Sequence, residues 1–252
     1  MVITGHTTFT AQYKTKFPGG FPVPPIGTPD GTASNTIKSI LETEDHIKYI
    51  TGYTDGTVKP GGEITRAEVA MIFWRLVKSS AKHGDVANTF SDVKDSDWYA
   101  QAVKYLAQIG IIAGYEDGSF RPNQSITRAE FVTIAARFDT LTPGLNNPFS
   151  DLASDHWAYL NIMSAYAKGW VAGNPDGTFR PNARITRAEV VTIVNKMLGR
   201  GIDKDDVPTE LDGTFKDLRR DHWAFEGIIE ASVAHEFYRK PNNREVWTSW
   251  TK

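Results

Sequence analysis

Cysteine is absent from the 252 residues, which excludes thiol nucleophiles, cysteine-ligated metal centres and disulfides. A basic excess is absent too, because 28 Lys and Arg face 30 Asp and Glu, so we expect no nucleic-acid partner. No apolar run is long enough to span a bilayer, and residues 1–10 lack the charged and apolar regions of a secretory signal. We therefore expect no membrane insertion, and either the protein is cytosolic or this chain is a piece of a longer one. If the protein is secreted, its signal peptide is expected to lie outside this chain.

A threefold repeat is the strongest feature that the sequence does contain. Three segments align without gaps from a Gly-x-x-Asp-Gly loop, through a proline, to Ile-Thr-Arg-Ala-Glu; they are 52–68, 114–130 and 173–189. A second signature, Phe-x-Asp with a tryptophan at constant spacing, covers 90–98, 149–157 and 215–223. The first repeat lacks this opening half, and the last opening half has no Thr-Arg-Ala-Glu after it. The pattern predicts a ring that the C-terminal half-repeat closes, because closure covers apolar faces that a terminal repeat leaves exposed.

Each repeat has the pattern of a helix, a loop and a second helix. Apolar residues over 98–109 recur at helical spacing, and Gly110 follows as a C-cap. Thr127 and Glu130 flank the start of the next apolar run as a capping box. Residues 236–250 read as a hairpin around the turn at 241–243. The sequence therefore predicts a mainly α fold of roughly six helices with a short C-terminal β-hairpin.

The positions of these motifs along the chain divide it into six expected segments. They are a remnant of an upstream β-module (1–16), a linker (17–43), the second half of repeat 1 (44–88), repeat 2 (89–146), repeat 3 (147–205), and a closing half-repeat with its tail (206–252).

An arginine follows the capping threonine in every repeat, at a helix start where the dipole disfavours a cation. These residues are Arg66, Arg128 and Arg187. Free helix N–H groups and a guanidinium together suit a carboxylate or a phosphate, and we expect the side chain to point outward. Pairing with the nearby Asp-Gly loop, or packing over the adjacent repeat, explains the position equally well. Residue chemistry alone leaves both interpretations open.

Other recurring residues have structural explanations. The tryptophans could stack on sugar rings, although a repeated tryptophan more often packs between repeats. The Asp-Gly aspartates suit turns better than calcium, and capping accounts for the repeated glutamates. No nucleophile–base pair recurs, and the scattered histidines give no metal site. We therefore expect neither catalysis nor a metal or cofactor.

Together these motifs resemble the S-layer homology domain family over approximately residues 44–235. The resemblance implies a three-pronged, pseudo-threefold helical bundle that anchors a secreted protein to the cell wall of a Gram-positive or related bacterium. It implies non-covalent binding to a secondary cell-wall polysaccharide, with the site arginines addressing the carboxylate of pyruvylated N-acetylmannosamine. The expected ligand-binding residues are Arg66, Arg128, Arg187, Gly52, Gly114, Gly173, Tyr53, Tyr115, Asn174, Asp55, Asp117, Asp176, Trp98, Trp157 and Trp223.

Two departures from the motif concern individual grooves. Asn174 stands where the other repeats have tyrosine, and Val58-Lys59 stands where they have Phe-Arg. The alternative to anchoring is an assembly module whose grooves bind neighbouring protein copies in a surface lattice.

Overall fold

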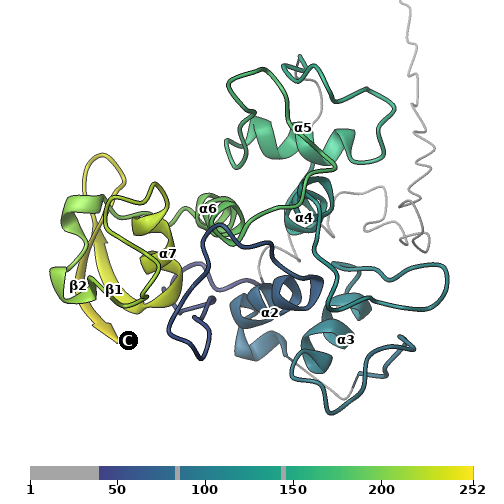
Figure 1. The fold of residues 1–252 in the computed structure, drawn as a ribbon, viewed down its shortest axis with the longest axis horizontal. Coiled ribbons are helices and arrows are strands. Elements are labelled where there is room, and N and C mark those ends of the chain that lie inside the picture. Colours follow the sequence, from purple (N-terminus) through teal and green to yellow (C-terminus); the bar gives the residue numbers. More distant parts are fainter. Residues whose placement is uncertain (1–39, 83–85, 143–145, 252) are drawn as a thin grey trace, which may run out of the picture.

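The computed structural model describes residues 40–82, 86–142 and 146–251. The expected β-module remnant and most of the expected linker lie outside these residues. The described chain is mainly helical and ends in an antiparallel hairpin, as the sequence predicts (Figure 1). Its α-helices are α2 (Arg66–Leu76), α3 (Ala100–Gln108), α4 (Arg128–Ala136), α5 (Tyr159–Ala167), α6 (Arg187–Leu198) and α7 (Phe225–Ser232). Short 3-10 turns cover Ser79–Ala81, Lys204–Asp206 and Thr209–Leu211, and the strands are β1 (Ala234–Arg239) and β2 (Glu245–Thr251).

The helices pack in pairs that join successive repeats. Helix α2 packs on α3, α4 on α5 and α6 on α7, so each capped helix contacts the first helix of the following opening half (Figure 1). Gly110 adopts a left-handed φ of 74°, as expected of a residue that ends a helix. Helix α3 begins at Ala100, two residues later than the apolar pattern predicts, because Tyr99 occupies the N-cap.

A cycle of backbone hydrogen bonds joins the three segments that precede the capped helices. Ile126 N donates to Ile64 O at 3.1 Å, Ile185 N to Ile126 O at 3.2 Å, and Ile64 N to Ile185 O at 3.3 Å. All three isoleucines are fully buried, so this cycle lies in the core. A pseudo-threefold bundle requires such contacts near its axis; the symmetry of the whole fold stays a prediction.

The C-terminal half-repeat makes the same contacts with repeat 1 that other opening halves make with their own repeats. Asp92 accepts hydrogen bonds from the backbone of Phe120 and Arg121 at 2.7 and 2.8 Å. Asp217 accepts the equivalent bonds from Val58 and Lys59, both at 2.8 Å. Residues 215–231 therefore occupy the place of the opening half that repeat 1 lacks in sequence.

We expect Asp217→Ala to lower the free energy of unfolding by about 1–2 kcal/mol, because two backbone N–H groups lose their acceptor. Asp221→Ala is the matched control, since Asp221 is exposed and, among the described residues, forms an ion pair only with Arg219 at 3.2 Å. The control should change stability by less than about 0.5 kcal/mol. Urea unfolding of both variants measures the difference, and equal stabilities would contradict the closing role of Asp217.

The last residues of the expected linker pack against the fold instead. Leu41 is buried and forms an isolated bridge with Val77, and Glu42 N donates to Leu76 O at 2.7 Å. The composition of residues 17–43 suggested a linker, but the apolar side chain of Leu41 finds a partner at the end of α2.

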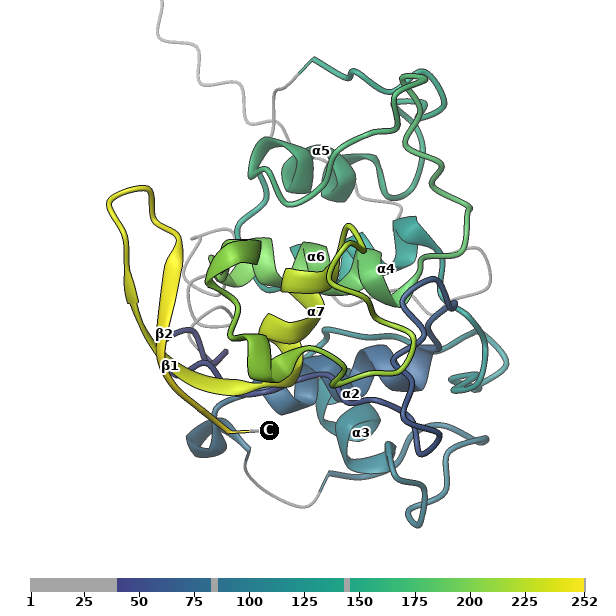
Figure 2. The same cartoon turned by 60° about the vertical axis from the view of Figure 1, so that its left-hand side comes forward.

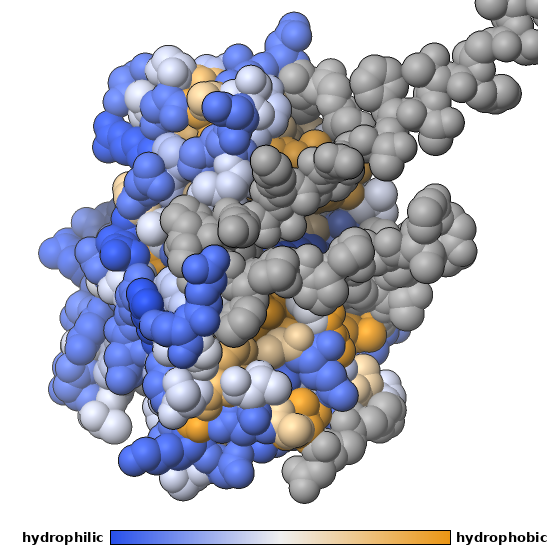
Figure 3. Space-filling model, turned by 90° about the vertical axis from the view of Figure 1, so that its right-hand side faces the viewer, coloured by the Kyte–Doolittle hydropathy of each residue, from blue (hydrophilic) through white to orange (hydrophobic). Residues whose placement is uncertain are grey.

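The surface includes both polar and apolar areas. Figure 3 shows one face on which hydrophilic residues cover the left side and hydrophobic residues gather toward the lower centre. Among the helices of the described residues, none combines the length and the hydropathy needed to cross a bilayer.

Candidate functional site

Each of the helices α2, α4 and α6 begins with the capping box that the sequence predicts. In α4, Thr127 N donates to Glu130 Oε2 at 2.8 Å, and Glu130 N donates to the Thr127 hydroxyl at 3.2 Å. The backbone N–H of Arg128 donates to Ala183 O of the next repeat at 2.9 Å. The first-turn donors are therefore already used, and the expected anion site made of free helix N–H groups is wrong.

The guanidinium groups of the site arginines reach across to the neighbouring repeat. The Nε atoms donate to backbone carbonyls: Arg66 to Phe120 at 2.8 Å, Arg128 to Phe179 at 3.0 Å, and Arg187 to Val58 at 2.8 Å. Arg66 is 7% exposed and Arg187 is 4% exposed. The expectation that these side chains point outward is wrong, because the loop of the next repeat covers each of them.

A cavity between repeats 1 and 2 contains Arg66 in its wall; we call it groove A. Its lining includes Gly114, Tyr115, Glu130 and Arg137 from repeat 2. The structure thus brings together Arg66, Gly114 and Tyr115, which the sequence predicted as ligand-binding residues of two different repeats. We call the equivalent places beside Arg128 and Arg187 groove B and groove C.

Groove A has an excess of positive charge. Arg66 Nη2 donates to Ala113 O at 2.7 Å, and its Cζ lies 5.0 Å from the centre of the Tyr115 ring. Arg137 adds a second guanidinium, whose Nη1 donates to Ile111 O at 2.8 Å. Burial lowers the pKa of Arg137 to about 10, which leaves it charged at neutral pH. The buried Tyr115 hydroxyl has no hydrogen-bond partner among the described residues.

In grooves B and C, the arginine already forms an ion pair with a carboxylate of the protein. Arg128 Nη1 lies 2.8 Å from Glu189 Oε1, and Arg187 Nη1 lies 2.9 Å from Glu68 Oε1. In groove C, Tyr53 donates to the same Glu68 oxygen at 2.7 Å; burial and this bond raise the pKa of Tyr53 to about 12. An anionic ligand there competes with the capping glutamate. Pairing of the arginines with the aspartates of the Asp-Gly loop is wrong, because Arg128 and Arg187 pair with a capping glutamate instead. The other structural alternative, packing over the adjacent repeat, is confirmed, since each arginine donates to a backbone carbonyl there.

Asn174 makes groove B different from the other two. Its Nδ2 atom donates to Thr178 O of its own loop at 3.0 Å, where the other repeats place an aromatic ring against an arginine. Groove B therefore has no aromatic side chain at this position.

The Asp-Gly aspartates form turns, as the sequence predicts. Asp117 accepts hydrogen bonds from Ser119 N at 3.0 Å and Ser119 Oγ at 2.5 Å, and it pairs with Arg121 at 2.9 Å. These hydrogen bonds lower the pKa of Asp117 to about 2. Asp176 makes the same contacts with Thr178 and Arg180, and Asp55 bonds Thr57. The aspartates thus shape the loops that carry the groove residues.

The first glycine of each loop leaves room for a phenylalanine ring. A Cβ on Gly114 would lie 2.4 Å from Phe90 Cε1, and one on Gly52 or Gly173 would lie 2.7 Å from Phe215 or Phe149. These glycines therefore join the loop of each repeat to its opening half, in addition to the position of Gly114 in the wall of groove A.

The three repeat tryptophans differ in burial and do not form a shared core between the repeats. Trp98 is 62% exposed and Trp223 is 59% exposed, so packing between repeats, the interpretation favoured from sequence, is wrong for both. Trp157 is partly buried and packs against the core. None of the three lines groove A. Sugar stacking by the two exposed rings stays a prediction.

A second cation in the grooves was missed from sequence. Arg137 lines groove A. Near groove C, Arg75 donates to Tyr49 O at 3.2 Å. Burial is the main cause that lowers the pKa of Arg75, and the nearby charge of Arg187 lowers it further. The signal was present, because Arg75, Arg137 and Lys196 follow the three site arginines at one constant offset. This basic position lies outside the repeated motifs, and one of its three members is lysine instead of arginine.

Comparison with known proteins places the repeats in one family. Residues 48–70, 89–132 and 148–191 match the model of the S-layer homology domain. The matched segments contain all three site arginines and the loops that form the grooves.

Three similar proteins show where such segments occur. The chain is 38% identical to the cellulosome-anchoring protein of Acetivibrio thermocellus over 81% of this chain and 46% of that protein. It is 36% identical to cell surface glycoprotein 1 of the same organism over 77% of this chain and 9% of that protein. It is 34% identical to exoglucanase XynX of Acetivibrio thermocellus over 65% of this chain and 16% of that enzyme. The chain thus spans less than half the length of each of these relatives.

Proposed function

The chain belongs to the S-layer homology domain family, and on that basis we propose that it is a non-catalytic module for anchoring at the cell surface. It binds an anionic secondary cell-wall polysaccharide in the grooves between its repeats, and pyruvylated N-acetylmannosamine is the unit that these grooves recognise. The names of the relatives support anchoring at a surface. The match to an exoglucanase covers only a small share of that enzyme, which fits a binding segment attached to varied cargo.

The charge of groove A is the observation that carries the proposal. Arg66 and Arg137 supply two guanidinium groups there against the single carboxylate of Glu130, and Arg66 donates to two backbone carbonyls. A ketal carboxylate is a planar anion that a guanidinium binds through charge-assisted hydrogen bonds. The Tyr115 hydroxyl offers a further hydrogen bond to the sugar. One such contact contributes about 1.5–3 kcal/mol, which accounts for modest affinity in a single groove.

Several grooves on one chain then act together on a polymer. Grooves B and C bind more weakly, because a ligand carboxylate must displace Glu189 or Glu68 from the arginine. Linked sites that face repeated epitopes gain about 10²–10⁴ in avidity. A module of this kind holds its cargo through many individually weak contacts.

Isothermal titration calorimetry against purified wall polysaccharide tests the proposal. The polysaccharide is used before and after acid removal of its ketal groups, with the same backbone as the matched control. We expect binding that is lost on removal and that weakens with salt, since the contact is between charges. Binding retained after removal would transfer recognition to the sugar backbone and the exposed tryptophans, and would contradict recognition of the anion.

Assembly with neighbouring protein copies is the second candidate function. The exposed rings of Trp98 and Trp223 favour it, because large apolar side chains at a surface often mark protein contacts. It predicts oligomers that grow with concentration in the absence of any sugar. Sedimentation of the chain alone, compared with Trp98→Ala/Trp223→Ala, distinguishes the two: a monomer at all concentrations rules out assembly through these rings.

A further inference from the structure

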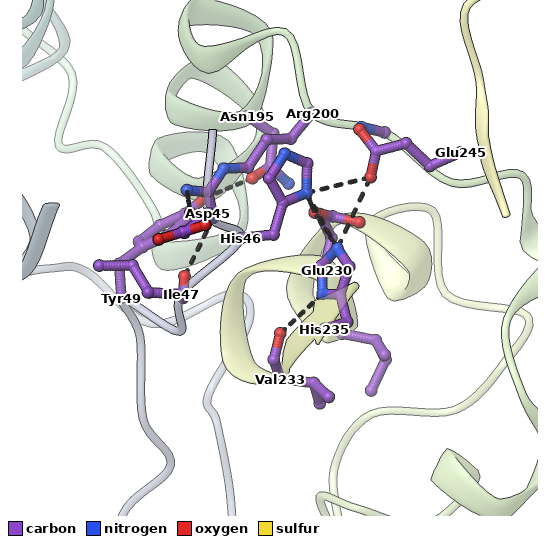
Figure 4. A network of polar contacts seen from close by, with 12 residues as sticks. Asp45, His46, Ile47, Tyr49, Asn195, Arg200, Glu230, Val233, His235 and Glu245 are labelled. Carbon is purple, nitrogen blue, oxygen red and sulfur yellow. Dashed lines mark hydrogen bonds and ion pairs between the residues drawn. The ribbon is translucent and has the colours of Figure 1, made fainter. Parts of the chain in front are cut away.

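Four buried side chains from distant parts of the sequence converge beside the C-terminal hairpin. His46 lies near the start of repeat 1, Glu230 is in α7, His235 is in β1 and Glu245 is in β2 (Figure 4). The two glutamates are 0% exposed, His46 is 2% exposed and His235 is 7% exposed. Figure 2 shows the hairpin curving past α7 toward the start of the described chain, which brings these elements together.

One atom from each side chain points at a common centre. His46 Nδ1 lies 2.9 Å from His235 Nε2, 3.2 Å from Glu230 Oε1 and 3.2 Å from Glu245 Oε2. His235 Nε2 lies 3.1 Å from Glu230 Oε1 and 3.6 Å from Glu245 Oε2. All four atoms lie within 4.8 Å of one another. Two imidazole nitrogens and two carboxylate oxygens thus surround a single point.

These separations are close to those of a tetrahedral metal site. Zinc binds histidine nitrogen and carboxylate oxygen at about 2.0–2.2 Å, which places the ligands of a tetrahedron about 3.3–3.6 Å apart. Five of the six separations run from 2.9 to 3.6 Å, within about 0.4 Å of the tetrahedral range. Calcium is a poorer fit, because it prefers six to eight oxygen ligands at longer distances.

Hydrogen bonds do not satisfy this cluster. Both carboxylate oxygens of Glu230 and Oε2 of Glu245 are buried and accept no hydrogen bond of adequate geometry from the described residues. Arg239 compensates only the far oxygen of Glu245, at 3.3 Å from Oε1. Burying two carboxylates is costly unless positive charge lies against them. A divalent cation at the common centre supplies that charge.

The surrounding residues orient the two rings for ligation. His235 Nδ1 lies 2.9 Å from Val233 O; its proton donates there and leaves Nε2 free to bind a metal, as partners of ligating histidines do. The His235 ring stacks on Trp247 at 3.8 Å, and the His46 ring stacks on Phe237 at 3.9 Å. Gly201 N donates to Glu245 Oε1 at 3.1 Å, which directs Oε2 toward the centre.

We propose that His46, Glu230, His235 and Glu245 form a structural binding site for zinc or a similar divalent transition-metal ion. Four protein ligands complete the coordination, as in structural rather than catalytic zinc sites. The sequence alone indicated no metal site, because the four ligands are far apart in the chain and only the fold brings them together.

The bound ion would fasten the closure of the ring. It joins the start of repeat 1 to α7 and to both strands of the hairpin, across the junction where Tyr49 N donates to Ala231 O at 2.9 Å. This junction leads directly into the groove C loop, which begins at Gly52. The metal site does not depend on the anchoring function, and its test uses no polysaccharide.

Metal binding is measured on the whole chain after treatment with a chelator. We expect ZnCl₂ to bind with one-to-one stoichiometry by calorimetry and elemental analysis. Zinc at about 100-fold above its dissociation constant should raise the midpoint of thermal unfolding by about 5–10 °C. CoCl₂ should give the intense visible absorption of a tetrahedral site. CaCl₂ should have little effect on the midpoint.

Glu245→Gln and His235→Gln keep the side-chain volume nearly constant and each remove one ligand. Both should lower zinc affinity at least about 100-fold, whereas the matched control His222→Gln, outside the cluster, should not. The cobalt spectrum of the unmodified chain keeps the test decisive if a variant fails to fold. Failure to bind zinc or cobalt, an octahedral cobalt spectrum, or equal affinity in all three variants would overturn the proposal and leave a buried His–Glu network.

Discussion

Arg66→Ala should weaken binding to the wall polysaccharide by about 10–100-fold, more than the same change at either of the other site arginines. The expected loss follows from one charge-assisted contact of about 1.5–3 kcal/mol. Arg66 donates to two backbone carbonyls rather than to a carboxylate, so its charge is available to a ligand. Calorimetry of the variant against intact polysaccharide measures the effect.

Arg128→Ala is the matched control for this prediction. Arg128 occupies the equivalent position, but its guanidinium is already paired with Glu189 at 2.8 Å. Its removal should weaken binding less than tenfold, and removal of all three arginines should abolish binding. Thermal unfolding must accompany each titration, because Arg66 also holds the loop of repeat 2. A larger loss for Arg128→Ala than for Arg66→Ala would mean that the paired grooves dominate, against the role assigned to groove A.

Gly114→Ala should destabilise the fold by about 3 kcal/mol. Its Cβ would meet Phe90 Cε1 at 2.4 Å and Ser119 O at 2.6 Å. A backbone oxygen cannot turn aside as a side chain can, so the loop or the opening half of repeat 2 must shift, and overpacking of this kind costs about 1–3 kcal/mol or more. Because Gly114 and Tyr115 line groove A, the same shift should also reduce polysaccharide binding.

Gly61→Ala is the control for the cost of adding a methyl group to a loop glycine. No atom of the described part of the chain lies within 4 Å of a Cβ at Gly61, and the φ of Gly61 is not left-handed. Its stability should change by less than about 0.5 kcal/mol, measured by urea unfolding alongside Gly114→Ala. Comparable stabilities of the two variants would show that the Gly114 loop tolerates a shift, and that the glycine is not required for the contact with Phe90.

The local structure could be predicted wherever its cause lies within a few residues. The capping boxes at Thr65, Thr127 and Thr186 are present because, when threonine and glutamate are three residues apart, the side chain of each accepts a hydrogen bond from the backbone N–H of the other. The aspartate turns and the C-terminal hairpin were predictable for the same reason. Trp98 failed as a core prediction, because burial depends on what lies opposite a side chain, and periodicity does not specify that.

The sequence by itself determined the repeat, its phase, its helices and the arginine that recurs in each repeat. The tertiary structure decided what those arginines contact: Arg66 reaches repeat 2 backbone, while Arg187 pairs with Glu68, more than a hundred residues away. It also brought His46 and Glu245 together from opposite ends of the described chain. Local patterns encode hydrogen bonds between near neighbours, whereas charge balance in a groove and ligand geometry around a point depend on segments that meet only when the ring closes.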